Sequence, residues 1–359
     1  MDTRDQNTPK TRRAFSRRDF VTHTALVGAG VALGPVLWAA GSAQRAELDN
    51  QSDKGLAQGR NMKSIQFRNG AITMAGNLHL PEGFDTARRY AAIVVVHPGG
   101  GVKEQTAGLY AQRLAEQGFV ALAFDASHQG ASGGEPRFLD DPMKRVGDIY
   151  SAVDYLTSLS YVDSNRIGAL GICAGSGAAI KAASLERRIK AVSTVSGVDV
   201  GAATRKGWEG KASKTDQLAI LDSVAKQRTA EAAGAAPVYL PYVPQVGDRT
   251  APRDLQEAAD YYLTPRGQHP NAPNKMLLTS MSSMVAFTGF DRVDLLTQPL
   301  LVIAGSEAGS LWHSEELHAK AAGPKELFIV KGATHMDLYD GERVPEVAGR
   351  LSQFFKRNL

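Results

Sequence analysis

Short apolar runs alternate with amphipathic stretches along most of this chain. Runs that are apolar at every position predict strands buried on both faces of a parallel sheet, since a strand with one wet face alternates apolar and polar residues. Stretches in which apolar residues recur every three to four positions predict helices. We expect strands at residues 91–97, 119–124, 166–172, 191–195, 300–304 and 326–330, and helices at residues 107–117, 145–159, 314–321 and 344–355. This alternation is that of a doubly wound, mostly parallel α/β sheet.

Two segments near the start of this pattern alternate apolar and polar residues instead. They cover residues 63–68 and 72–80 and flank the dipeptide Asn69-Gly70. Asn-Gly is a strong hairpin signal because both residues tolerate the positive φ of a two-residue turn. We therefore expect an antiparallel pair of strands at one edge of the sheet.

The alternation breaks between residues 198 and 293. This stretch lacks strand-like runs and holds helical stretches at residues 214–233 and 254–262, joined by Pro-rich pieces. Because it interrupts the chain after a sheet strand, we expect a helical cap over the carboxyl ends of the strands, inserted into a core of residues 44–197 and 294–359. The aromatic residues of this stretch either line an apolar pocket or form the cap's own core: Trp208, Tyr239, Tyr242, Tyr261, Tyr262 and Phe287.

Residues 1–43 have the features of a targeting segment. Arg17 and Arg18 form a twin-arginine pattern, a modestly apolar run follows over residues 25–40, and small residues predict cleavage after Ala43. Such signals are read by the twin-arginine translocation machinery, which exports folded proteins, so we expect the mature protein in the periplasm. An uncleaved membrane anchor is the alternative, although the run is short and weakly hydrophobic for a span.

Composition narrows the function classes. Apolar residues make up 43% of the chain and charged residues 22%, as in ordinary globular proteins. Of the net charge of +4, residues 1–43 carry +3, from six Lys/Arg and three Asp/Glu, so the remainder carries about +1. A field this weak gives no reason to expect nucleic acid as a partner. The sequence also lacks a metal-ligand cluster and the glycine patterns of dinucleotide or phosphate loops, so we predict neither a metal nor a cofactor.

One strand ends in a motif with the form of a nucleophile turn. Residues 166–172 run into Gly-x-Cys-x-Gly, with Gly171, Cys173 and Gly175, and then into an Ala-rich helix. The flanking positions require glycine because a Cβ there would collide with the neighbouring strand and helix. We interpret Cys173, the only cysteine of the chain, as the nucleophile. The alternative is that it is simply a small buried hydrophobe.

A glycine-rich loop follows the strand at residues 91–97. Its sequence His-Pro-Gly-Gly-Gly contains Gly100 and Gly101, whose main-chain N–H groups are free to approach a substrate. Together with the N–H of Ala174, the residue after Cys173, either of these glycines would form an oxyanion hole. The alternative is that the loop is only a turn.

A histidine with the position of a catalytic base lies near the C-terminus. His335 falls just past the last expected strand, where a loop reaches over the strand ends toward the nucleophile. The acid that orients such a histidine is expected after the strand at residues 300–304. The carboxylate found there is Glu307, so we propose it as the third member. If Glu307 points away, a Cys–His pair still works, because a thiol ionises far more readily than a hydroxyl.

These motifs, in this order, resemble the α/β-hydrolase superfamily and within it the dienelactone-hydrolase-like branch, whose nucleophile turn is also Gly-x-Cys-x-Gly. The resemblance covers most of the chain except the cap. It implies Cys173 as nucleophile, His335 as base, and oxyanion donors at Ala174 and near Gly100. The branch has an aspartate a few residues after the position of Gly305, where this chain has Ala308 and Gly309. Some fungal polyketide transferases and thiohydrolases of similar layout imply that acyl transfer from a thioester is also possible on such a scaffold.

The sequence thus predicts an exported, cofactor-free hydrolase of carboxylic esters, lactones or thioesters that uses a Cys-His(-acid) mechanism. Two other interpretations stay open. One is an acyltransferase that passes the acyl group to an alcohol or amine, and the other is a catalytically silent binding protein on the same fold. The physiological substrate and the oligomeric state are not encoded in any motif that we identify.

Overall fold

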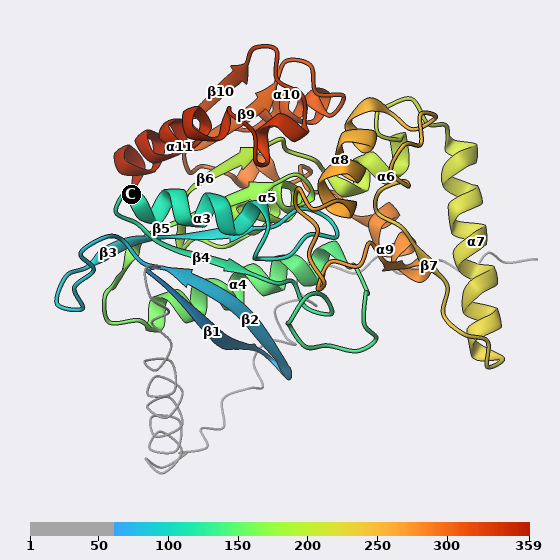
Figure 1. The fold of residues 1–359 in the computed structure, drawn as a ribbon, viewed down its shortest axis with the longest axis horizontal. Helices are drawn as coiled ribbons and strands as arrows, with labels where there is room; N and C mark the ends of the chain where they lie inside the picture. The colour runs from blue at the N-terminus through green and yellow to red at the C-terminus, as the bar shows by residue number, and fades with distance from the viewer. Residues whose placement is uncertain (1–60) are drawn as a thin grey trace, which may run out of the picture. The chain divides into compact units, whose positions relative to one another are not determined.

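A computed structural model describes residues 61–359, so the predicted signal segment at residues 1–43 lies outside the described residues. The centre of the fold is an eight-stranded sheet of order β1-β2-β4-β3-β5-β6-β9-β10 (Figure 1). Its strands are β1 (Met62–Asn69), β2 (Ile72–His79), β3 (Tyr90–Val96), β4 (Val120–Phe124), β5 (Val162–Ile172), β6 (Ile189–Val195), β9 (Leu300–Gly305) and β10 (Lys325–Val330). The prediction of a mostly parallel α/β sheet is therefore confirmed.

The antiparallel edge of the sheet is where the sequence places it. β1 pairs with β2, and β2 pairs with β4, in antiparallel register, whereas β4 through β10 are paired in parallel. Asn69 and Ile72 face each other across the turn, and Gly70 has a φ of 56°. The Asn-Gly dipeptide therefore forms the predicted hairpin.

Helices cover both faces of the sheet. α3 (Thr106–Glu116) and α11 (Val344–Asn358) pack on one face, and α4 (Pro142–Ser158), α5 (Ala174–Leu185) and α10 (Leu311–Lys320) on the other (Figure 1). α4 begins sharply because the Asp141 carboxylate accepts hydrogen bonds from two amides of its first turn and a proline occupies the first helical position. These crossovers hold the carboxyl ends of the parallel strands together at one edge of the sheet.

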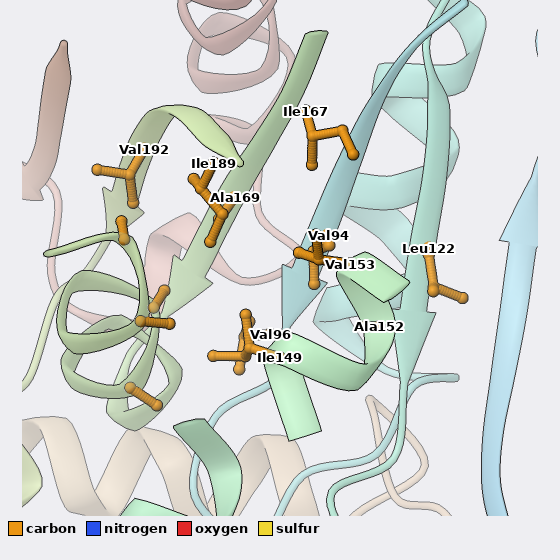
Figure 2. Close-up of a cluster of buried hydrophobic side chains, with 14 of the residues drawn as sticks. Val94, Val96, Leu122, Ile149, Ala152, Val153, Ile167, Ala169, Ile189 and Val192 are labelled. Atoms are coloured by element: carbon orange, nitrogen blue, oxygen red, sulfur yellow. The ribbon is translucent and has the colours of Figure 1, made fainter. Parts of the chain in front are cut away.

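The core explains why the central strands are apolar at every position. In β3, Val94 and Val96 belong to the cluster under α4, where they lie near Ile149 and Val153 (Figure 2). Their neighbour Val95 points to the opposite face and packs with the residues of α3 and α11. Each face of the strand is thus buried under a helix layer, so neither set of alternating positions tolerates polar residues.

The predicted insertion, residues 198–293, lies at one end of the sheet (Figure 1) and is called the cap below. It contains α6 (Val200–Lys206), α7 (Lys214–Ala232), α8 (Arg253–Leu263), η1 (Leu278–Ser280), α9 (Met281–Ala286) and the start of η2 (Val293–Leu295). It also contains a two-stranded pair, β7 (Tyr239–Leu240) and β8 (Met276–Leu277), which the sequence reasoning missed because two residues carry no periodicity. Across residues 61–359, every helix is too short or too polar to cross a bilayer.

Candidate active site

Cys173 lies on a strained turn between β5 and α5. Its backbone has φ 51° and ψ −123°, a combination that residues other than glycine rarely adopt. A Cβ on Gly171 would lie 2.5 Å from the Cα of Ser176, and a Cβ on Gly175 would lie 2.4 Å from the carbonyl oxygen of Val96. Both contacts are with backbone, so both flanking glycines are required for the turn to pass between the strand and the helix.

The turn places the thiol at the N-terminus of α5. The N–H of Ala174 is hydrogen-bonded to Cys173, and the side chain of Cys173 is only half-buried. A helix N-terminus favours negative charge because its first amides point outward without intrahelical partners. The position therefore favours the thiolate over the thiol.

His335 reaches the thiol from the loop after β10. Its imidazole is buried, its Nδ1 lies 2.7 Å from Ser310 Oγ, and the ring is hydrogen-bonded to Cys173. Ser310 ends the loop after β9, so the two loops that follow β9 and β10 hold the imidazole in place. The structure thus brings together Cys173 and His335, which the sequence placed far apart along the chain.

The two reacting groups shift each other's proton affinity. Burial raises the pKa of Cys173, but the charge of His335 and hydrogen bonds from His335 and Tyr339 outweigh it and bring the pKa below its usual value. Burial lowers the pKa of His335, but the charge of Cys173 and their hydrogen bond outweigh it and raise the pKa. Both shifts favour the thiolate–imidazolium pair, which is the reactive state for nucleophilic catalysis.

Tyr339 contacts both members of this pair. Its hydroxyl lies 3.3 Å from His335 Nε2 and is hydrogen-bonded to the sulfur of Cys173. Burial, followed by the charge of Cys173, raises the pKa of Tyr339 well above its usual value. The phenol therefore stays protonated and can donate to the thiolate.

The prediction that Glu307 orients His335 is wrong in this structure. Glu307 is exposed, and its carboxylate accepts a hydrogen bond of 3.1 Å from Arg253. The group on Nδ1 of the imidazole is the hydroxyl of Ser310 instead. The backbone of Glu307 is fixed by an N–H bond to Ala333, which turns its side chain outward.

The glycine-rich loop also departs in part from the prediction. The N–H of Gly101 donates to the carbonyl oxygen of Pro98, so this amide closes a turn and is not available to a substrate. Gly100 has a φ of 68°, and a Cβ added to it would lie 2.5 Å from the ring of Tyr242. Pro98 and Gly99, rather than Gly100 or Gly101, contribute to the cavity wall beside Ala174. Ala174 is therefore the predicted oxyanion donor that the structure places at the site.

A cavity of about 440 Å³ opens at Cys173 between the strand ends and the cap. Such a volume is in the range of small-molecule sites. Most of its apolar wall comes from the cap and includes Val198, Val200, Leu255, Met276, Met281 and Met284. Within residues 61–359, His, Cys, Asp and Glu side chains do not gather in threes as a metal site would require.

A buried polar network lies at one side of this cavity. Arg145 donates to Asp140 at 3.0 Å, and the hydroxyl of Tyr242 donates to the other oxygen of the same carboxylate at 2.7 Å. Burial lowers the pKa of Arg145, but the charge of Asp140 outweighs it and raises the pKa. Asp140 lines the cavity but is fully paired, so it shapes the wall and joins the cap to the core.

The aromatic residues of the cap do not all take one of the two roles that the sequence left open. Trp208, Tyr242 and Tyr262 line the cavity. Phe287 and Tyr261 are buried in the core clusters of the sheet, and Tyr239 is exposed at the surface.

Two residues at the site were missed by sequence reasoning, and the contact made by a third was not foreseen. Ser310 lies in the stretch that was searched for a carboxylate, so its hydroxyl was passed over. Tyr339 lies one turn after His335, a spacing that would have suggested a contact if the 3₁₀ turn η3 (Met336–Leu338) had been expected. Trp208 was a candidate for the pocket wall, but its contact with His335, with ring centroids 5.1 Å apart, was not predicted because no periodicity shows how the cap packs.

Comparison with known proteins places this geometry in a family. The model of the dienelactone hydrolase family matches residues 74–227. The protein YcjY of Escherichia coli (strain K12), described as uncharacterized, is 45% identical over 294 residues, which are 81% of this chain and 96% of the relative. This chain belongs to the dienelactone hydrolase family.

Further relatives match most of the chain. The crystal structure of the hypothetical protein PA2218 from Pseudomonas aeruginosa superposes with a TM-score of 0.79 at 37% identity and covers 85% of this chain and 96% of its own. Among enzymes, the polyketide transferase claH of Penicillium crustosum is 25% identical over 308 residues, covering 83% of this chain and 98% of claH. The family match covers the nucleophile turn and part of the cap, while the relatives extend over most of the described residues.

Proposed function

We propose that this protein is an exported hydrolase of carboxylic esters, lactones or thioesters in which Cys173 is the nucleophile and His335 the general base. One observation carries the proposal: a thiol on a strained turn is hydrogen-bonded to a buried imidazole and opens into an apolar cavity of about 440 Å³. The opposed pKa shifts of the two groups support it. Membership of the dienelactone hydrolase family agrees with a hydrolase.

The first half of the reaction forms an acyl-enzyme. His335 takes the proton of the Cys173 thiol, and the thiolate attacks the carbonyl carbon, so that an S–C bond forms and the carbonyl oxygen becomes an oxyanion. The oxyanion collapses and expels an alcohol or thiol, which takes the proton from His335. A lactone follows the same steps, except that breaking the C–O bond opens the ring and the alcohol stays attached to the acyl group.

The second half releases the acid. His335 removes a proton from a water molecule, the hydroxide attacks the thioester carbonyl, and the sulfur leaves as the thiolate. In both halves the oxyanion is held by the N–H of Ala174 and the N–H of Gly99, which lines the same cavity. Tyr339 stabilises the thiolate that leaves, because its hydroxyl donates to the sulfur.

The cavity favours an apolar acyl group. Three methionines of the cap, Met276, Met281 and Met284, form part of its wall. Unbranched methionine side chains adapt to irregular shapes, so this wall accepts acyl chains of different outline. The ion pair of Asp140 with Arg145 at the wall is already satisfied and does not select a charged substrate.

The test is turnover of a chain-length series of p-nitrophenyl esters by the mature protein, together with Cys173→Ala and His335→Ala. We expect measurable hydrolysis by the wild type, with a chain-length optimum set by the cavity, and a loss of at least about 1,000-fold in either variant. Circular dichroism and thermal melting show whether each variant stays folded. Absence of turnover in the wild type together with no acylation of Cys173 contradicts the proposal and leaves a binding protein on the same fold as the explanation.

Acyl transfer is the second candidate, and the apolar cavity favours it. A dry site protects a thioester intermediate from water and gives an alcohol or amine acceptor time to attack. The relative named as a polyketide transferase supports this possibility. Adding alcohols or amines to the ester assay separates the two reactions, because a transferase releases acylated acceptor at the expense of free acid.

Export through the twin-arginine pathway remains part of the proposal on sequence alone. Arg17 and Arg18 carry it. Replacing both with lysine in the full chain is expected to retain the protein in the cytoplasm, and cell fractionation measures this directly. Unchanged delivery to the periplasm by the double variant would show that another route is used.

A further inference from the structure

A carboxylate from the cap, rather than Glu307, lies near His335. Asp254, in the first turn of α8, is only 3% exposed and lines the cavity. Its Oδ2 accepts a hydrogen bond of 2.7 Å from the N–H of Gly309 and another of 3.0 Å from Nε1 of Trp208. Buried carboxylates are rare unless a charge or a set of donors holds them, so this arrangement needs an explanation.

Gly309 and Trp208, the two residues that donate to Asp254, connect it to the imidazole of His335. Gly309 precedes Ser310, whose hydroxyl lies 2.7 Å from His335 Nδ1. The ring of Trp208 meets the ring of His335 edge to face, with centroids 5.1 Å apart and an interplanar angle of 68°. One carboxylate therefore binds both Trp208, which contacts His335, and Gly309, the neighbour of the serine on His335 Nδ1.

The charge of Asp254 acts on the same ring. The titratable groups that act on His335 include Cys173 from the nucleophile turn, Tyr339 directly after η3, and Asp254 and Glu257 from α8. Burial lowers the pKa of His335, while the charges of Cys173, Asp254 and Glu257 raise it, in that order. The neighbouring His313 of α10 is buried, and burial followed by the charge of His335 lowers its pKa to about 3, so it stays neutral.

The two carboxylates of α8, Asp254 and Glu257, differ in whether they are paired with a cation. Glu257 forms a 2.9 Å ion pair with Arg253, whose guanidinium is well exposed, so its charge is balanced and screened. Asp254 accepts from two neutral N–H donors rather than from a cation, and it is buried, where Coulomb interactions are less screened.

We propose that Asp254 is the acid of this site, a positioning residue supplied by the cap in place of a carboxylate from the loop after β9. It holds Ser310 and Trp208 against the imidazole and stabilises the imidazolium that forms when the proton leaves the thiol. The S–H bond of Cys173 breaks, an N–H bond forms on His335, and the new positive charge lies beside the buried carboxylate. The inference rests on the proposed function only in taking Cys173 and His335 as the reacting pair.

The position of Asp254 also makes the site depend on the cap. The residue is far in sequence from both the nucleophile and the base, and it reaches them because α8 packs against η3, in the loop after β10 that carries His335. Core residues alone therefore give a Cys–His pair without its acid.

The test replaces Asp254 with Asn, which keeps the size of the side chain and an oxygen for the two donors but removes the charge. The readout is the rate of alkylation of Cys173 by iodoacetamide as a function of pH. Since Cys173 is the only cysteine, the rate reports its thiolate alone. We expect the midpoint of the profile to rise by about 0.5 pH unit or more, because the imidazolium that favours the thiolate is less stable.

Glu307→Gln is the matched control. It also removes one carboxylate near the same loop, but from an exposed side chain paired with Arg253. We expect its midpoint to coincide with that of the wild type. A folded Asp254→Asn protein with the wild-type midpoint, or a larger shift for Glu307→Gln, overturns the proposal.

A second variant keeps the proposal testable if Asp254→Asn does not fold. Trp208→Phe retains an aromatic ring against His335 but removes the indole N–H that holds the carboxylate. We expect a smaller upward shift of the same midpoint, and an unchanged midpoint contradicts the proposal. Alkylation needs no ester turnover, so failure of the proposed hydrolase activity would be seen separately in the p-nitrophenyl ester assay.

Discussion

The loops that follow β5 and β9 both contribute to the same site, but they are fixed in different ways. The loop after β5 carries Cys173 on a turn whose shape is imposed by contacts within a few residues and with the adjacent strand. The loop after β9 carries Ser310, and its conformation depends on Asp254 and on the loop after β10. The nucleophile is therefore placed by local sterics, whereas the group that orients the base is placed by tertiary contacts.

The difference indicates which parts of such a site tolerate change. A turn that requires glycine on both sides of the nucleophile has no alternative conformation, so its sequence signature is short and rigid. A histidine can be oriented by any hydrogen-bonding group that reaches its outer nitrogen, so the acid position is free to move to another element. In this chain two residues share the role of the acid: Ser310 of the core contacts the imidazole, and Asp254 of the cap supplies the carboxylate.

The largest expected effect is on the loop after β5. In Gly175→Ala the new Cβ would lie 2.4 Å from the carbonyl oxygen of Val96 and 2.7 Å from that of His97, both backbone atoms of β3 and the turn after it. We expect the free energy of unfolding to fall by about 2–3 kcal/mol, since overpacking against backbone has no rotamer that relieves it. Chemical denaturation measures the change, and alkylation of Cys173 is expected to slow in parallel.

Gly349→Ala provides the control for this substitution. Gly349 lies in α11, and a Cβ there meets nothing within 4 Å. The same chemical change is expected to stabilise the protein by up to about 1 kcal/mol, because alanine is the better helix former. If Gly175→Ala is as well tolerated as Gly349→Ala, local sterics do not fix the nucleophile turn.

The next effect concerns the coupling between the two loops through His335. The charge and hydrogen bond of His335 lower the pKa of Cys173 against the effect of burial. Without the imidazole, burial acts alone and raises that pKa, so the thiolate forms only at higher pH. We expect His335→Ala to slow alkylation by iodoacetamide at pH 6.5 by at least about 10-fold and to restore part of the rate at pH 9.

His318→Asn serves as the comparison for that variant. His318 lies in the last turn of α10 and is half-buried, away from the thiol. Its alkylation profile is expected to match that of the wild type. A profile for His335→Ala that is parallel to the wild type at every pH would show that the two groups are not coupled.

Ser310→Ala tests the loop after β9 directly and has an intermediate expected effect. It removes the group 2.7 Å from His335 Nδ1 and leaves a buried polar nitrogen without that partner. An unsatisfied buried donor is destabilising by about 1–3 kcal/mol, so we expect kcat/KM for ester hydrolysis to fall by about 10-fold or more. Ser306→Ala is the control, because the Ser306 hydroxyl lies in the same loop but accepts from the N–H of Gly332 instead. Equal activity of the two variants would remove Ser310 from the site.

The strands and the nucleophile turn were predictable because their signals are local. β3 is apolar at every position since both of its faces are buried. One strand boundary was nevertheless predicted wrongly. β5 begins at Val162, four residues before the predicted start. Residues 163–165 continue the strand but are polar and largely exposed, so they do not look like part of a buried strand. Gly171 and Gly175 identified the turn because no other residue fits their positions.

The residues that orient His335 could not be predicted from local sequence signals. A serine at position 310 and an aspartate at position 254 are common surface residues, and nothing in their neighbours shows that both are buried beside an imidazole. Glu307 was chosen because it is a carboxylate in the expected loop, but its backbone conformation directs the side chain to solvent and to Arg253. The role of a polar residue is thus set by the partner that packs on it, which a single sequence does not contain.

The smallest expected effect is that of Glu307→Gln on turnover and stability. The ion pair with Arg253 is long at 3.1 Å, and both side chains are more than half exposed, so water and salt screen it. We expect kcat/KM to stay within about 2-fold of the wild type and the free energy of unfolding to change by no more than about 0.5 kcal/mol. A loss of activity as large as that of Ser310→Ala would mean that Glu307 turns inward during catalysis. In that event the loop after β9 would supply its own acid. It would then differ from the rigid loop after β5 because it moves during catalysis, and not because it depends on Asp254 of the cap.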